Sequence, residues 1–448
     1  MNRSSRYLCE IRPTLILALP IIVGQVSQTL MNVTDSMMIG HVGTVPLAAA
    51  SFGGTLFGLF YVIGIGLLVP VSIFVSRARG AAQPQEAAEY LRHGVAMAVG
   101  FGVLETLVLA ALSTQLHRFG QPPEVLAIVT PFLLLNAASI TPVLVYLALR
   151  QFAEAMGRPW LPMYVMLGGV GLNVLLNWVF VFGHLGAPAL GLTGSGIATL
   201  LARTIGAAVI FAWIRLDPRL RAAWPTQWFA PLARARVREM MHVGLPASGM
   251  LFFEVTAFAA AAIMVGWLGA VPLAAHQITL TCASFSFMFP LGLSMAAGIR
   301  ISHAVGAHEL HRLRPIAVTA VGISLAMAAA FGLAYGFGGR LISTWFVKDP
   351  VVIALATQLL IVAALFQLFD GWQVTGAALL RGITDVKVPA VITFAAYWLI
   401  SLPLGYLLGV RGSLGALGIW IGIAGGLACA AVLLSARFAR LTRPRPEA

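Results

Sequence analysis

The chain carries one sequence pattern twice, at a constant offset of 226 residues. Leu19-Pro20 in the first half recurs as Leu245-Pro246 in the second. A half-chain repeat restricts the fold to two similar halves, and in an apolar chain it is typical of transporters that bind substrate between two lobes. The same offset, with no gap, aligns Met38, Gly40, Gly43, Val45, Pro46, Leu47, Ala48 and Ala49 with Met264, Gly266, Gly269, Val271, Pro272, Leu273, Ala274 and Ala275, and Gly66, Ser76, Gly80 and Ala81 with Gly292, Ser302, Gly306 and Ala307.

The composition indicates a protein that lies within a membrane. Hydrophobic residues make up 59% of the 448 residues and charged residues only 10%. A soluble protein of this length cannot bury that much apolar surface. A membrane-spanning helix needs about 20 apolar residues. The sequence predicts twelve such spans, at residues 13–39, 48–76, 93–116, 125–149, 160–183, 190–214, 238–266, 273–300, 315–338, 351–378, 389–409 and 414–436.

Each repeat contains six of the predicted spans. Because six is an even number, both halves have the same orientation, and a pseudo-two-fold axis along the membrane normal is expected to relate them. We therefore predict an all-α integral membrane protein with two six-helix lobes, residues 1–218 and 232–448. The longest basic connection, about residues 215–237, is rich in arginine and contains Pro218, Pro225 and Pro231, and residues 219–231 within it are predicted to form a cytoplasmic linker between the lobes.

The basic residues are unevenly divided among the predicted loops, in a chain of formal net charge +13. Most lie at the termini or in alternate loops, whereas the opposite loops hold only Arg118, Arg340, Lys348 and Arg411. By the positive-inside rule, this distribution places both termini in the cytoplasm. No single basic surface is assembled, so we expect contact with anionic lipids of the bilayer and no nucleic-acid partner. Arginine used in place of lysine, with abundant alanine and glycine, indicates a GC-rich bacterial genome and hence the bacterial cytoplasmic (inner) membrane.

Four acidic residues lie well inside predicted spans: Asp35, Glu105, Glu254 and Asp370. A carboxylate there costs at least ~2.5 kcal/mol, even on lenient insertion scales. The repeat indicates that the fold does not need three of them, because the other half has an alanine, a glutamine or an apolar residue opposite Asp35, Glu254 and Asp370. We predict functional roles for these three. For Glu105, in an ordinary Leu/Val stretch, a protonated acid that is hydrogen-bonded within the bundle is the favoured interpretation.

Glu254 and Asp370 can meet within one lobe if the seventh and tenth spans pack together. A carboxylate in a dry cavity can exchange a proton for a cation, and two carboxylates can hold Na⁺ between their oxygens. We therefore predict that Glu254 and Asp370 are possible Na⁺ ligands and that, with Asp35, they couple transport to a cation or proton. Neighbouring polar side chains, among them Gln277 and Gln367, can either complete the shell or bridge helices, which is the commoner role in membrane bundles.

Asp35 is predicted to face a polar cavity in the first half of the chain. Asn173 and Asn177 are spaced i,i+4 on the fifth span and share one face. Asn32 and Thr199, from the first and sixth spans, are predicted to line the same cavity. In the second half, aromatic and methionine side chains predict soft walls that suit large organic cations: Phe253, Phe285 and Met288.

Three stretches of the chain resemble one family of membrane transporters. Residues 37–49, MMIGHVGTVPLAA, and residues 378–382, ALLRG, with Asp385 and Pro389, resemble the multidrug and toxic compound extrusion (MATE) family. Residues 397–406, YWLISLPLGY, look like its NorM-type branch, and the resemblance covers nearly the whole chain. It implies a twelve-helix, two-lobe secondary active antiporter that exports cationic amphipathic compounds in exchange for Na⁺ or H⁺ by alternating access. We expect no enzymatic activity, no cofactor other than the coupling ion, small organic cations and drugs as substrates, and a functional monomer.

The resemblance also implies roles for single residues. Asp35 matches the first-helix acid that handles protons or substrate, and Asn173 matches the asparagine of a polar motif on the fifth helix. Glu254 and Asp370 match the acids of the cation site in the second half. Two positions depart from the pattern: Asn177 stands where some branches have Asp, and Phe366 where some Na⁺-coupled members have a Tyr. The second departure removes one possible oxygen ligand for Na⁺.

A lipid-linked oligosaccharide flippase of related two-lobe architecture is the main alternative. Such a protein should line its cavity with arginines that bind pyrophosphate, whereas only Arg203 lies well inside a predicted span. A membrane enzyme is not indicated, because no paired His, Cys or Ser-His arrangement lies at membrane depth. A channel would reveal itself by single-channel currents in a bilayer.

Overall fold

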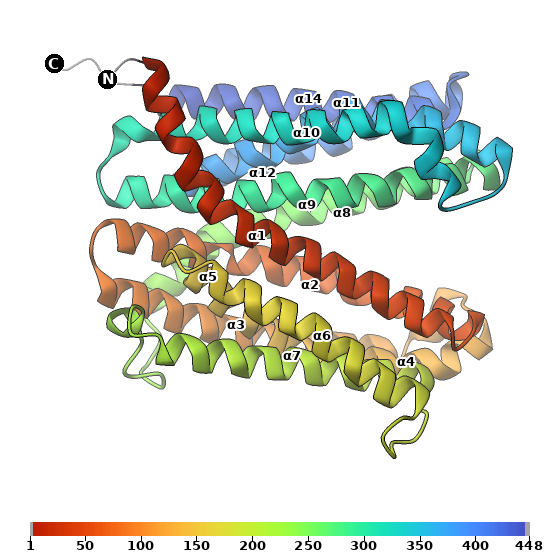
Figure 1. Ribbon diagram of the computed structural model, residues 1–448, viewed down its shortest axis with the longest axis horizontal. Helices are drawn as coiled ribbons and strands as arrows, with labels where there is room; N and C mark the ends of the chain where they lie inside the picture. Colours follow the sequence, from red (N-terminus) through yellow and green to blue (C-terminus); the bar gives the residue numbers. More distant parts are fainter. Residues whose placement is uncertain (1–2, 444–448) are drawn as a thin grey trace. The chain divides into compact units, whose positions relative to one another are not determined.

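The computed structural model describes the backbone of residues 3–443 and the side chains of residues 7–443. All regular structure in this range is helical (Figure 1). The elements are α1 (Arg3–Gly40), α2 (Thr44–Gly80), α3 (Pro84–Ser113), η1 (Leu116–Phe119), α4 (Pro123–Ala138), α5 (Ile140–Ala155), α6 (Trp160–Phe182), α7 (Gly191–Leu216), η2 (Arg221–Ala223), α8 (Arg234–Gly266), α9 (Ala270–Gly306), η3 (Leu310–Arg312), α10 (Leu313–Thr344), α11 (Pro350–Gly382), α12 (Lys387–Phe394), η4 (Ala395–Ser401), α13 (Leu402–Gly405), η5 (Tyr406–Arg411) and α14 (Gly415–Leu441).

Twelve helical segments of the described chain are long and apolar enough to cross a membrane. Each coincides with one of the twelve predicted spans, which confirms the all-α membrane fold. Two of them join several elements: α4 and α5 form Pro123–Ala155, and α12 to η5 form Lys387–Arg411. Most of the helices run past the predicted ends, because polar residues continue the helix where the apolar stretch stops.

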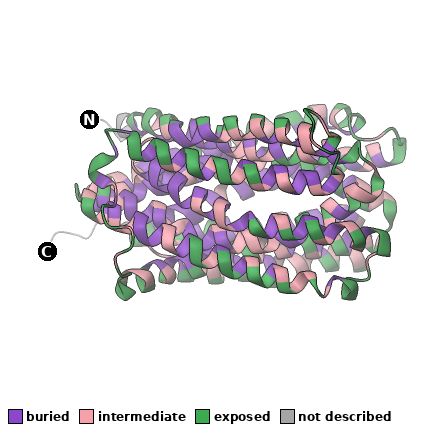
Figure 2. Ribbon diagram, turned by 90° about the horizontal axis from the view of Figure 1, so that it is seen from below, coloured by how far each residue is buried: buried purple, intermediate pink, exposed green. Residues whose placement is uncertain are grey.

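The outward sides of the helices are apolar, as contact with lipid requires. On α10, Leu333, Phe337 and Leu341 follow one another at a spacing of four residues and are all exposed. Buried residues lie instead on the sides that face neighbouring helices (Figure 2). Exposed apolar side chains of this kind are expected on a helix that is surrounded by hydrocarbon and not by water.

Contacts divide the described chain into two compact units. Unit 1 contains the chain up to Gln25 and from Gly249 onward, and unit 2 contains Val26–Ser248. Helix α11 is the centre of unit 1, where it packs against α9, α10 and α14, and α5 packs against α2, α3 and α7 in unit 2. The units differ from the predicted lobes in the first parts of α1 and α8, which join helices of the opposite repeat. The lobe boundaries themselves stay a prediction.

Two repeat-equivalent glycines let α1 and α8 approach helices of the opposite repeat closely. In unit 1, a Cβ added to Gly292 of α9 would lie 2.8 Å from the Cα of Ile22 on α1. In unit 2, a Cβ added to Gly66 of α2 would lie 2.3 Å from the Cα of Ser248 on α8. Real side chains do not tolerate such distances, so only glycine permits either crossing. The hydroxyl of Ser248 also donates a hydrogen bond of 2.6 Å to the Ile63 carbonyl of α2.

Ion pairs, which we call the crossed ion pairs, also join the amino-terminal parts of α1 and α8 to elements of the opposite repeat. In unit 1, Glu10 of α1 accepts from Arg312 of η3 at 3.0 Å and also pairs with Arg300 of α9. In unit 2, Arg236 of α8 donates two hydrogen bonds to Glu86 of α3, at 2.6 and 2.8 Å. At the offset of 226, Glu10 aligns with Arg236, and Glu86 with Arg312. The repeats therefore conserve the contact while they reverse its charges.

Candidate functional site

The second half of the chain places two carboxylates in one electrostatic environment. Glu254 lies on α8 and Asp370 on α11, both in unit 1. Asp370 is only 4% exposed, and its Oδ1 has no hydrogen-bond partner among the described residues. Asp370 interacts electrostatically with Glu254. Glu254 also interacts electrostatically with Arg381 of α11. The structure thus brings the predicted pair together.

A buried tyrosine, which the sequence analysis did not select, completes this set. Tyr397 of η4 is 1% exposed and interacts electrostatically with both Glu254 and Asp370. Its hydroxyl has no hydrogen-bond partner among the described residues. In the sequence Tyr397 is visible only as one letter of a branch-specific motif, because nothing local shows which helix its ring faces.

Other neutral oxygens lie on or beside the part of α11 that contains Asp370. The hydroxyl of Ser324 on α10 would lie 2.8 Å from a Cβ added to Gly371, the residue next to Asp370. Neither Ser324 Oγ nor Oε1 of Gln373, one turn further along α11, has a described partner. The ring of Phe366 packs edge-on against Trp420, with centroids 5.4 Å apart.

The available oxygen atoms determine which kind of cation this site suits. The described residues contain no group of three or more His, Cys, Asp and Glu side chains that could bind a metal. A cation at Glu254 and Asp370 would therefore be bound by two carboxylates and neutral oxygens, which suits Na⁺ better than a transition metal.

Two of the residues predicted to line a cavity make contacts between helices. The amide of Gln367 donates to the Ala283 carbonyl at 2.9 Å and so bridges α11 and α9. Phe253 packs on Phe394 with centroids 5.0 Å apart. The remaining predicted residues on α9 differ in burial: Gln277 and Phe285 are exposed, and Met288 is half-buried.

Asp35 and the two asparagines of α6 form the polar centre of unit 2. The Asn177 amide donates to Asp35 Oδ1 at 2.7 Å and to Asn173 Oδ1 at 3.1 Å. Asn173 Nδ2 and Asn177 Oδ1 have no partner among the described residues. Thr199 is buried on α7, whereas Asn32 of α1 is exposed and is not part of this hydrogen-bonded set.

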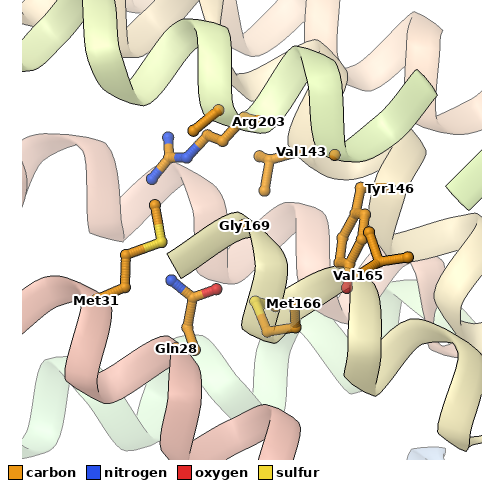
Figure 3. A pocket seen from close by; sticks show the side chains of 10 residues that line it. Gln28, Met31, Val143, Tyr146, Val165, Met166, Gly169 and Arg203 are labelled. Carbon is orange, nitrogen blue, oxygen red and sulfur yellow. The ribbon is translucent and has the colours of Figure 1, made fainter. Parts of the chain in front are cut away.

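A cavity opens near this centre, and we call it the unit 2 cavity. Four helices supply its walls (Figure 3), and the space between them, which includes open solvent, is about 440 Å³. Its lining is apolar apart from a few groups, which include the Arg203 guanidinium and the Gln28 amide. The lining residues are Gln28, Met31, Val143, Tyr146, Val165, Met166, Gly169, Ala202, Arg203 and Gly206.

Glu105 lies apart from both sets. It is 7% exposed on α3, and neither of its carboxyl oxygens has a hydrogen-bond partner among the described residues. The hydrogen bond expected for it within the bundle is therefore absent, because its neighbours Gly64 and Leu144 offer only an apolar surface.

The fold and these sites together define a class of protein. Twelve apolar helices make the chain a multi-pass membrane protein. Carboxylates within membrane-spanning segments are characteristic of ion-coupled transporters. A family model, MatE, matches residues 20–179 and 246–407, once in each repeat. The chain belongs to this family, the multidrug and toxic compound extrusion transporters, and to its NorM-type branch.

Individual relatives agree with this assignment. The Probable multidrug resistance protein NorM of Mesorhizobium japonicum is 36% identical over 98% of this chain and 95% of its own length. The Multidrug resistance protein MdtK of Yersinia pseudotuberculosis is 32% identical over 99% of this chain and 98% of its own. At the level of the fold, an outward-facing multidrug resistance MATE family transporter superposes with a TM-score of 0.89 at 20% identity, covering 97% of both chains. The eukaryotic MATE transporter AtDTX14 superposes with a TM-score of 0.87 at 20% identity, covering 98% of this chain and 99% of its own.

We expect the variant Asp35→Asn to insert normally and to export substrate at least about tenfold more slowly. The substitution keeps an oxygen that can accept the Asn177 hydrogen bond, but it removes the ionisable charge. The matched control is Thr34→Val, because the Thr34 hydroxyl bonds only to the Leu30 carbonyl of its own helix. Export of a fluorescent dye from cells, normalised to protein in the membrane, measures the difference. Equal export by Asp35→Asn and the control would show that the charge is dispensable.

Proposed function

We propose that this protein is a secondary active multidrug efflux antiporter of the bacterial cytoplasmic membrane. It exports cationic amphipathic compounds in exchange for Na⁺ or H⁺. The single observation that carries the proposal is the electrostatic coupling of half-buried Glu254 with buried Asp370 and Tyr397, where Asp370 Oδ1 and the Tyr397 hydroxyl have no described hydrogen-bond partner. The names of the relatives, which are multidrug resistance proteins, support the substrate class.

Repulsion between Glu254 and Asp370 gives a physical reason why this site binds and releases a coupling cation. Two acids in one apolar environment repel each other when both are ionised, so binding of a proton or a Na⁺ stabilises the pair. Release of that cation restores the repulsion. A cation can drive transport only if it binds two conformations of the protein with different affinity. We propose that this difference arises because only one conformation closes the oxygens of Tyr397 and its neighbours around Glu254 and Asp370.

We further propose that the conformations alternate by rocking of residues 1–218 against residues 232–448. Each crossed ion pair joins one residue from either segment: Glu10 with Arg312, and Arg236 with Glu86. With the termini in the cytoplasm, both pairs lie at the cytoplasmic ends of their helices. In this rocking model the first parts of α1 and α8 move with their own repeats, so both pairs separate when the cytoplasmic side opens, and their strength sets part of the balance between the two states.

Ethidium movement into or out of proteoliposomes tests this function. The purified protein is reconstituted, and dye fluorescence is followed under an imposed Na⁺ gradient and, separately, under an imposed pH gradient. Movement driven by Na⁺ supports binding of Na⁺ at Glu254 and Asp370, and movement driven only by the pH gradient supports protonation of carboxylates. Absence of movement under both gradients contradicts multidrug antiport. Flipping of a pyrophosphate-linked lipid in the same vesicles, without ethidium movement, would support the flippase instead.

A further inference from the structure

Arg203 carries a positive charge that its surroundings do not neutralise by contact. It lies in the middle of α7, where a guanidinium is costly and usually functional. Its Nη1 donates to Ser139 Oγ at 2.6 Å, and its guanidinium carbon lies 4.5 Å from the centroid of the Phe57 ring. No described acid lies within ion-pair distance, and Nε and Nη2 donate to no described residue. Arg203 therefore retains N–H donors for a further acceptor.

These donors face the unit 2 cavity. Arg203 is one of its lining residues, and Figure 3 shows the guanidinium and the Gln28 amide directed into the space beside Met31. Most of the remaining wall is apolar or aromatic, with Met166 contributed by α6 and Tyr146 by α5. An apolar cavity with one guanidinium and one amide is suited to a molecule that has an aromatic body and an anionic oxygen.

A carboxylate, that of Asp35, lies on α1 one turn beyond Met31 of the cavity wall. Gln28, Met31 and Asp35 lie on one face of α1, since their spacing is i, i+3 and i+7. Asp35 interacts electrostatically with Arg203 but gives its hydrogen bond to Asn177 instead. Unit 2 thus holds a carboxylate on α1 and, close enough to interact with it electrostatically, a guanidinium on α7. A purely cationic molecule can pair only with the carboxylate of Asp35, whereas a zwitterion can pair with both Asp35 and Arg203.

We propose that Arg203 is a specificity-determining residue that selects amphipathic molecules bearing a carboxylate beside their cationic centre. Its free N–H groups and the Gln28 amide bind the carboxylate, and the cationic centre lies toward Asp35. This inference rests on the proposed export function, which makes the unit 2 cavity a substrate site. It adds a preference for substrates with a carboxylate, which acidic residues in the protein alone do not explain.

Two dyes that differ by one methyl group test the proposal. Rhodamine 110 has a free carboxylate, and rhodamine 123 is its methyl ester, so the two share size and aromatic body but differ in this charge. Dissociation constants are measured by fluorescence polarisation on the full protein in lipid nanodiscs. The variants are Arg203→Met, Arg203→Lys and Gln28→Leu, with Arg215→Met as the control, because Arg215 is exposed on the same helix outside the cavity.

Arg203→Met is expected to weaken binding of rhodamine 110 at least tenfold and to change binding of rhodamine 123 less than threefold. Arg203→Lys should weaken binding of rhodamine 110 less than Arg203→Met does, because lysine keeps the positive charge but lacks the planar, bidentate N–H groups of arginine. Equal weakening of both dyes would show that Arg203 only supports the packing or acts as a counter-ion for Asp35, and it would overturn the proposal. No change for either dye, or no binding of rhodamine 110 by the unaltered protein, would overturn it as well.

The same preparations separate this inference from the proposed function. If dye discrimination depends on Arg203 but no gradient drives either dye across proteoliposomes, the selectivity stands and the antiport function is wrong. If a gradient drives both dyes equally well in the unaltered protein and in Arg203→Met, the antiport function stands and the selectivity is wrong.

Discussion

The variants Glu254→Gln and Asp370→Asn are each expected to lower ion-driven export about 100-fold or more, while the protein still inserts in the membrane. A neutral amide cannot exchange a proton or attract Na⁺, so the cation no longer distinguishes two conformations. The alanine variants should abolish export in the same way. Melting temperature should stay at or above that of the unaltered protein, because each amide removes a charge from a site where Asp370 Oδ1 has no partner. Full export by both variants would exclude this pair as the coupling site.

The coupling ion can be identified from the hydroxyl of Tyr397. The variant Tyr397→Phe removes only this oxygen, and Phe366→Tyr adds one at the position one turn before Asp370. If Na⁺ is bound here, Tyr397→Phe should raise the Na⁺ concentration needed for half-maximal export about tenfold, and the double variant should recover part of this loss. If only protons are exchanged, Na⁺ has no effect in any variant, and export follows the pH gradient alone.

A second large effect is expected from Glu10, which pairs with Arg300 and Arg312. Glu10 and Arg300 have side chains only 8% and 10% exposed. The variant Glu10→Gln leaves the buried guanidinium of Arg300 without an acid, which typically costs about 3–5 kcal/mol. Since about 1.4 kcal/mol is a tenfold change in population, the conformation closed at the cytoplasmic side should lose at least ~100-fold in population. Export in proteoliposomes and melting temperature should both fall.

The repeat supplies a matched control for this experiment. Glu86→Gln breaks the equivalent pair in unit 2, but Glu86 and Arg236 are 42% and 24% exposed. A solvent-exposed pair contributes about 1 kcal/mol or less, so this variant should export within a few-fold of the unaltered protein. The double variant Glu10→Gln/Arg300→Met removes the stranded charge and should recover much of the stability. Similar losses in Glu10→Gln and Glu86→Gln would contradict a conformational role that depends on burial.

The predicted spans agree with the structure because the signal for them is local. Each apolar stretch is long enough to require a helix in hydrocarbon, whatever its neighbours are. The same reasoning identifies Asp35, Glu254 and Asp370 as unusual, because the insertion cost of an acid depends on its own position along a span. The repeat adds a comparison within one chain, which separates acids that the fold requires from acids that it does not.

The amino-acid sequence by itself therefore determined the twelve spans, the half-chain repeat and the carboxylates at membrane depth. The tertiary structure decided which of these residues share an environment. Tyr397 faces Glu254 and Asp370, and Arg203 faces the unit 2 cavity, only because particular helices pack together. The crossed ion pairs depend in addition on α1 and α8 each joining helices of the opposite repeat. The physical reason is that hydropathy reports the solvent around a helix, whereas helix packing depends on side-chain shapes hundreds of residues apart.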